Sequence, residues 1–81
     1  MKARITVSFK EGLLDPQGQT IQQSLTSLGF KGVQRVRAGK SFEVELESMP
    51  RDEAERQLSK MCDQLLVNPT IEQYRVEITA D

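Results

Sequence analysis

Apolar and polar residues alternate along the first ten positions of the chain and again near its end. The apolar members of the first run are Ala3, Ile5, Val7 and Phe9. Those of the last run are Tyr74, Val76 and Ile78. A period of two is typical of strands with one buried face, so both runs predict half-buried strands.

Between these strands, the spacing changes to that of a helix. Ile21, Leu25 and Leu28 recur at i, i+4 and i+7 and form one apolar stripe. Asp15 before Pro16 predicts the start, because an Asp side chain caps free N–H groups and proline loses no bond at the first helical position. Gly29 suits the left-handed residue that ends a helix.

A hairpin is expected next. Pairing residues 36–38 with residues 42–44 keeps the apolar side chains on one face and leaves residues 39–41 as a three-residue loop. The same register would place Arg37 opposite Glu43, and Arg35 opposite Glu45, as cross-strand charge pairs.

A second helix is predicted from Pro50 to Leu66. Its expected apolar face consists of Ala54, Leu58, Met61, Cys62, Leu65 and Leu66. Asn68-Pro69 stops the helix, because the residue before a proline is pushed away from helical geometry. Ile71 is out of phase with the last strand, which predicts a bend or bulge near residues 72–73.

The resulting order is β-α-β-β-α-β in one domain spanning residues 1–81. Its simplest α+β architecture is a four-stranded antiparallel sheet with two helices on one face, with ferredoxin-like connectivity. The strand edges and the second face of the sheet would then be free for self-association.

The small size of the chain makes partners important. Its 81 residues are 37% hydrophobic, with no Trp, so the core is thin. Cys62 is the only cysteine and His is absent, which excludes an internal disulfide and a His- or Cys-based metal site. We therefore expect a homo-oligomer, dimer or tetramer, as the additional source of stability.

Charge and composition argue against several partners. The 11 basic and 12 acidic residues are interspersed, and no basic face for nucleic acid is evident. No apolar run has membrane-spanning length, and the chain starts with a strand pattern instead of a signal peptide. A single unpaired cysteine fits a reducing compartment, so we expect a cytoplasmic protein.

Catalysis by this chain alone is not expected. His, the commonest acid–base group in catalysis, is missing from the sequence. Cys62 lies on the apolar stripe of the second helix, so we interpret it as a small buried hydrophobic residue. Lys40 follows a glycine but lacks a Walker pattern, so an ordinary turn is the simpler interpretation. A contact of Arg37 and Lys40 with an acidic patch of a partner remains open.

Three short stretches together resemble the signature of the PurS family. They are Leu13-Leu14-Asp15-Pro16-Gln17-Gly18, Val36-Arg37-Ala38-Gly39-Lys40 and Asn68-Pro69-Thr70-Ile71-Glu72-Gln73-Tyr74. PurS is the small subunit of multi-subunit phosphoribosylformylglycinamidine (FGAM) synthase, a ligase of purine biosynthesis. The resemblance implies shape or partner-contact roles for Asp15, Pro16, Gln17, Gly18, Arg37, Gly39, Lys40, Asn68, Pro69, Glu72 and Tyr74.

The resemblance also implies a function without catalysis. PurS-like chains bridge a glutaminase subunit and an ATP-dependent synthetase subunit, so that ammonia from glutamine reaches formylglycinamide ribonucleotide. ATP, Mg and glutamine would be used by these partners, with no cofactor on this chain. The alternative is an ACT-like domain that senses a small molecule at a dimer interface. An RNA-binding sheet is a poorer fit, because the central strands lack paired aromatic residues.

Overall fold

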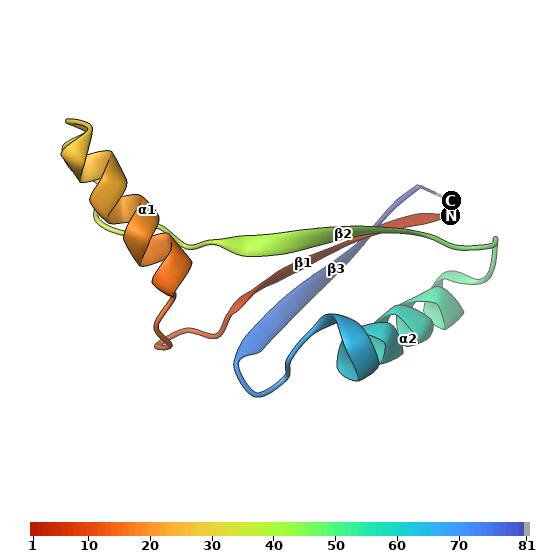
Figure 1. Ribbon diagram of the computed structural model, residues 1–81. Coiled ribbons are helices and arrows are strands. Elements are labelled where there is room, and N and C mark those ends of the chain that lie inside the picture. Colours follow the sequence, from red (N-terminus) through yellow and green to blue (C-terminus); the bar gives the residue numbers. More distant parts are fainter. Residues whose placement is uncertain (81) are drawn as a thin grey trace.

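The structure of the protein is a computed structural model that describes residues 1–80. Its elements are β1 (Lys2–Phe9), α1 (Pro16–Ser27), β2 (Gly39–Glu45), α2 (Arg51–Met61), a π-helical turn η1 (Cys62–Leu66) and β3 (Glu72–Ala80). The two predicted helices and the first and last strands are confirmed. The start of β1 and the end of β3 lie at the same end of the sheet (Figure 1).

The three strands form one antiparallel sheet in the order β2-β1-β3. Ile5 at the centre of β1 pairs with Phe42 of β2 on one side and with Val76 of β3 on the other. The apolar residues of all three strands therefore share one face. The register of β1 and β3 shifts near Thr79, so the bulge predicted at residues 72–73 is misplaced. Ile71 is out of phase because it precedes the strand.

The predicted hairpin, and with it the fourth strand, is wrong. Residues 30–38 contain no strand, and Gly39 and Lys40 start β2, paired with Ser8 and Val7. The even-numbered positions from 36 to 46 continue one alternation, so a straight strand satisfies the pattern as well as a turn does. This alternative requires only that Lys40 lie on the apolar face. Its aliphatic stem makes that possible while its ammonium group stays in water.

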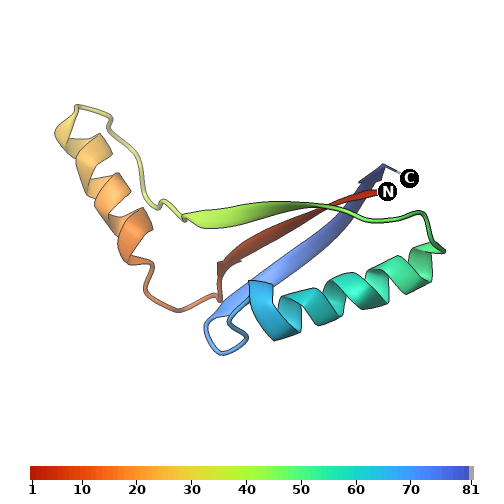
Figure 2. The same cartoon turned by 45° about the vertical axis from the view of Figure 1, so that its right-hand side comes forward.

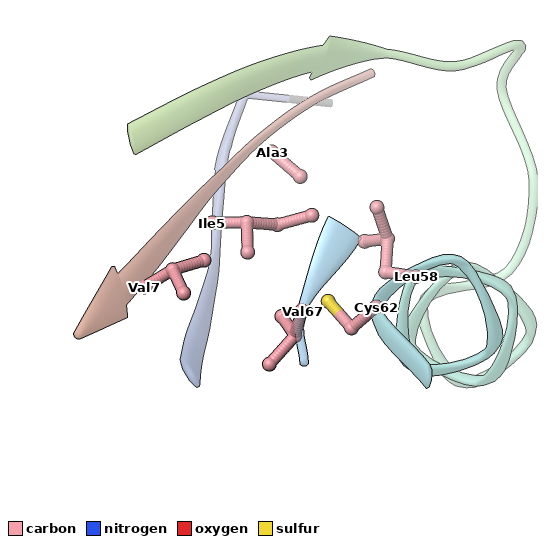
Figure 3. Packing of buried hydrophobic residues seen from close by; sticks show 6 residues of the cluster. All are labelled: Ala3, Ile5, Val7, Leu58, Cys62 and Val67. Atoms are coloured by element: carbon pink, nitrogen blue, oxygen red, sulfur yellow. The ribbon is translucent and has the colours of Figure 1, made fainter. Parts of the chain in front are cut away.

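The core lies between β1 and the second helix. Ala3, Ile5 and Val7 point toward Leu58 and Cys62 (Figure 3). Within the described residues, the fully or nearly fully buried hydrophobic side chains are Ala3, Ile5, Val7, Ala54, Leu58, Cys62 and Val67.

One residue of the predicted helical stripe is misplaced. Leu65 is 83% exposed, although its spacing placed it on the apolar face. The reason is local, because the last turn of this helix is π-helical and widens the i→i+4 repeat that the prediction assumed.

Among the elements of residues 1–80, only α2 covers a face of the sheet, whereas two helices on one face were expected. α1 projects beyond the end of the sheet, away from α2, in both views (Figures 1 and 2). The chain extends over 49 × 26 × 15 Å with a radius of gyration of 16.1 Å. A compact chain of this length would have a radius of gyration of roughly 12 Å. We call residues 10–38, which carry α1 away from the sheet, the arm.

Candidate functional site

The Asp15 carboxylate accepts two hydrogen bonds where the arm meets the sheet. Its Oδ1 accepts a hydrogen bond from the N–H of Gly18 at 2.9 Å, which caps α1 as predicted. Its Oδ2 accepts from the N–H of Ala38 at 2.8 Å, immediately before β2. These two backbone donors hold the pKa of the Asp15 carboxyl below its ordinary value, with the nearby charge of Arg37 as a smaller cause. One side chain therefore joins the start of α1 to the end of residues 30–38, which lead back from α1 to β2 and which we call the return segment.

Gly18 lets the helix and the return segment approach closely. A Cβ at this position would lie 2.2 Å from the carbonyl oxygen of Val36, so no larger residue fits without movement of the backbone. One turn later, the Gln22 amide donates to the carbonyl oxygens of Val33 at 3.1 Å and Gln34 at 2.9 Å. The arm thus consists of α1 and the return segment, and hydrogen bonds from the helix hold the two side by side.

Arg37 ties the same return segment to the end of β1. Its guanidinium donates to the Phe9 carbonyl at 2.6 Å and to the Glu11 carboxylate at 2.8 Å. Arg35 reaches the same carboxylate at 3.3 Å.

The predicted pairing of Arg35 and Arg37 with Glu45 and Glu43 is therefore wrong. The two glutamates instead lie within salt-bridge distance of Lys2, at 3.7 and 3.8 Å. The prediction failed because it depended on a hairpin that the chain does not form.

Gly39 allows β2 to pack closely against β1 and does not lie in a turn. A Cβ there would lie 2.4 Å from the carbonyl oxygen of Val7, the residue opposite Lys40 on β1. Positive φ angles occur instead at Gly12, Gly29 and Gly32. That of Gly29 confirms its predicted role at the end of α1.

Glu72, in the stretch from Asn68 to Tyr74, contacts Lys40, in the stretch from Val36 to Lys40. Lys40 Nζ lies 3.6 Å from one carboxylate oxygen of Glu72 and 5.7 Å from the centre of the Phe42 ring. The other carboxylate oxygen of Glu72 accepts from the N–H of Asn68 at 2.8 Å. The Asn68 side chain in turn accepts from the N–H of Thr70 across Pro69. Glu72 therefore stabilises the turn before β3 and links it to β2.

All three stretches consequently meet at one end of the sheet, where the arm begins. A shallow groove there is lined by Gln17 from the first stretch, Gly39 and Lys40 from the second, and Glu72 from the third. Tyr74 lies beside it, on the strand position opposite Val7. We call this groove and the residues around it the arm junction.

The contacts at the arm junction are structural and electrostatic. Its charges are largely paired with one another, and its glycines permit backbone contact. Outside it, Cys62 is buried, and burial raises the pKa of its thiol, with a smaller contribution from the charge of Asp63. Residues 1–80 contain no group of three side chains suited to hold a metal ion and no helix able to cross a membrane.

Two residues important at the arm junction and along the arm were missed by the sequence reasoning. Glu11 was not singled out, because nothing local connects it with arginines more than twenty positions away. Gln22 carried a weak signal, because it lies one helical turn after Gly18, on the side of α1 that faces the return segment.

Comparison with known proteins shows the family of this chain. The family model described as "PurS: Phosphoribosylformylglycinamidine (FGAM) synthase" matches residues 2–80. The chain belongs to the PurS family. A PurS subunit of Synechocystis is 48% identical over 95% of this chain and 77% of its own length. One from Archaeoglobus fulgidus is 41% identical over 94% of this chain and 95% of its own.

Solved PurS structures share this fold. Bacillus subtilis PurS matches with a TM-score of 0.87 and 42% identity, covering 98% of both chains. A chain in the structure of PurLQS from Thermotoga maritima matches with a TM-score of 0.86 and 35% identity, over 96% of this chain and 95% of that one. The projecting arm is included in this coverage, so the extended shape is common to these PurS-family chains.

Proposed function

We propose that this chain is the small, non-catalytic subunit of FGAM synthase in purine biosynthesis. It would hold the glutaminase and the ATP-dependent synthetase together, so that ammonia from glutamine reaches formylglycinamide ribonucleotide. The observation that carries the proposal is the family match over residues 2–80, supported by the similar chain in the PurLQS structure. The physical contribution is positioning, which raises the effective concentration of ammonia near its acceptor.

The surface of the chain supports a role in assembly. Large apolar side chains remain exposed on the arm, including Leu14 at 67% and Phe30 at 58%. β2 and β3 lie at the two edges of the sheet, and each leaves one side for another chain to meet. We propose that these surfaces contact the larger subunits or another copy of the chain, and that ATP, Mg and glutamine are bound by the larger subunits.

We propose that the eleven family-matched residues share one role at the arm junction. Asp15, Gly18 and Arg37 set the direction of the arm, and Gly39 lets β2 lie close against β1. We infer that their contribution to assembly is to fix the angle between the arm and the sheet. A partner that contacts both parts would then meet one rigid surface, which lowers the entropic cost of binding.

The ACT-like sensor fits the structure less well. That interpretation rested on a four-stranded sheet with two helices on one face, and this sheet has three strands with α1 directed away from it.

The assembly proposal is tested by mixing this chain with the glutaminase and synthetase subunits of its own organism. With glutamine and ATP present, light scattering after size-exclusion chromatography should show one species containing all three. FGAM formation should then require this chain when glutamine is the nitrogen source. It should not require the chain when an ammonium salt is supplied, because the synthetase then has its ammonia directly. Glutamine-dependent activity that is unchanged without the chain would overturn the proposal.

A further inference from the structure

The arm is joined to the sheet by two segments of chain with a hollow between them. Residues 10–15 lead out from β1, and residues 33–38, the last part of the return segment, lead back to β2 (Figure 1). The hollow has a volume of about 180 Å³ and is lined in part by Leu13, Leu14 and Val36. No residue of the two segments is buried. We call residues 10–15 and 33–38 the neck, and it has no apolar core that could fix the direction of the arm.

The two segments of the neck are not paired through their backbones either. Within the described part of the chain, no backbone–backbone hydrogen bond joins residues 10–15 to residues 33–38. Gly12 has a φ of 84°, in a region that glycine adopts more easily than other residues. A segment with neither a backbone ladder nor buried contacts changes its direction at little cost. The direction of the arm therefore depends on side chains that cross the neck.

Glu11 makes two of the contacts that cross the neck. One of its carboxylate oxygens lies 2.8 Å from a guanidinium nitrogen of Arg37, and the other lies 3.3 Å from one of Arg35. Arg37 also donates to the carbonyl oxygen of Phe9 at 2.6 Å, so the group that Glu11 binds is itself bound to the end of β1. Asp15 adds its hydrogen bond from Ala38. One carboxylate on the outgoing segment thus holds two positions of the return segment.

The exposure of these side chains separates an effect on direction from an effect on stability. The side chain of Glu11 is 66% exposed and that of Arg35 is 58% exposed. Ion pairs this accessible to water contribute little to the free energy of unfolding. Losing the Glu11 carboxylate should therefore change the direction of the arm while leaving the chain folded, because little else in the neck resists bending.

We propose that Glu11 is a positioning residue, which holds the arm at one angle to the sheet by binding Arg35 and Arg37 together. A larger subunit that contacts both the arm and the sheet then meets them in a fixed relative position. Binding a fixed surface costs less entropy than ordering a mobile one, so Glu11 strengthens assembly without contacting the partner. This inference rests on the proposed function, because it names the residue that sets the geometry of the assembly subunit.

The direction of the arm is measured by pulsed electron paramagnetic resonance on the isolated chain. Spin labels are attached at Ser27→Cys, at the end of α1, and at Lys60→Cys, on α2, with the buried Cys62 replaced by alanine. Labelled chain is diluted with unlabelled chain, so that only distances within one chain are recorded. With Glu11 present, the two labels should show one narrow distance distribution. Glu11→Lys should broaden it, because a cation would replace the carboxylate between two arginines.

The double variant Glu11→Lys/Arg35→Glu tests whether charge is the cause. It exchanges the charges across the neck and leaves Arg37 with its bond to Phe9, so the distance distribution should become narrow again. High salt should broaden the distribution of the unchanged neck, because it screens exposed ion pairs. Far-UV circular dichroism checks that each variant is folded, and Glu11→Gln, with a smaller broadening expected, replaces Glu11→Lys if that variant unfolds.

Assembly is measured as the concentration of chain that gives half-maximal complex with the glutaminase and the synthetase. Glu11→Lys should raise this concentration by about fivefold, the factor that corresponds to the strongest exposed ion pairs. Adding Arg35→Glu should return it close to the wild-type value. Glu55→Lys is the matched control, because it makes the same charge change in the ion pair with Arg51 on α2, away from the neck, and should alter neither the label distance nor assembly.

A Glu11→Lys chain with a distance distribution as narrow as that of wild type would overturn the inference. So would an assembly defect that Arg35→Glu does not relieve, or one that Glu55→Lys shares. Failure of the proposed function would look different, because wild-type chain would then not join the glutaminase and the synthetase at all. The spin-label comparison on the isolated chain would still decide whether Glu11 sets the direction of the arm.

Discussion

Gly18→Ala should destabilise this protein, although replacing a helical glycine by alanine ordinarily stabilises a helix. The added Cβ would lie 2.2 Å from the carbonyl oxygen of Val36 and 2.9 Å from Oδ2 of Asp15. An ordinary contact between such atoms is about 3.5 Å, so the helix and the return segment would have to separate by roughly 1 Å. The hydrogen bond between Asp15 and Ala38 would be strained by this movement, because it joins the same two segments.

The size of the effect follows from two opposed contributions. Forcing an extra methyl group into a close contact typically costs about 1–3 kcal/mol. The higher helix propensity of alanine returns up to about 1 kcal/mol. The net loss in the free energy of unfolding should be about 1–2 kcal/mol, which lowers the Tm of a domain this small by about 5–15 °C.

Thermal unfolding followed by circular dichroism, at one fixed chain concentration, measures this shift. Gln23→Ala is the matched control, because it also introduces alanine into α1 but at an exposed position, and it should leave Tm unchanged or slightly raised. A Gly18→Ala variant as stable as the control would show that the close approach of Gly18 and Val36 does not constrain the arm.

Three other predictions concern the arm base and the core. The pKa of Asp15 is lowered from 3.8 on folding, so its contribution to stability is complete above that pH and is lost as the pH falls through the lower, folded-state value. Denaturant titrations between pH 5 and pH 2.5 should thus show less acid destabilisation in Asp15→Asn than in wild type; equal pH dependence would contradict this. Leu58→Ala, at a fully buried site, should cost about 2–5 kcal/mol in urea unfolding, whereas Leu65→Ala should change stability by no more than about 0.5 kcal/mol. The buried thiol of Cys62, with its raised pKa, should react with a thiol reagent only as fast as the chain opens, so labelling of the native protein at the rate of a free thiol would refute its burial.

The local elements were predictable where one strong signal decided them. Asp15-Pro16 marked the start of α1, and the alternation of apolar residues marked β1 and β3, because capping and strand periodicity act over a few neighbouring positions. The end of the second helix was less predictable, since Leu65 kept the correct spacing for a normal α-helix and the wider final turn moved it to the surface.

The candidate site was only partly accessible from sequence. The family resemblance selected residues in three separate stretches, and the structure brings these stretches together at the arm junction. Their partners were not evident, because the contact between Arg37 and Glu11 crosses 26 positions of the chain and that between Lys40 and Glu72 crosses even more. A role for Gly39 in a turn was a reasonable prediction, but its close approach to Val7 depends on a neighbouring strand.

The sequence by itself determined two helices, the two terminal strands, the cap of α1 and membership of the PurS family. Only the tertiary structure decided that residues 39–41 belong to the strand β2 and do not form the loop of a hairpin. Alternation at every second residue is satisfied equally by a hairpin with a three-residue loop and by a continuous strand, so local pattern cannot separate them. The choice depends on which strand offers backbone partners to Gly39 and Lys40, and β1 does so. The straight path leaves α1 without a sheet to cover and makes it a projecting arm, because a helix can fold back onto the sheet only if its connections return it there.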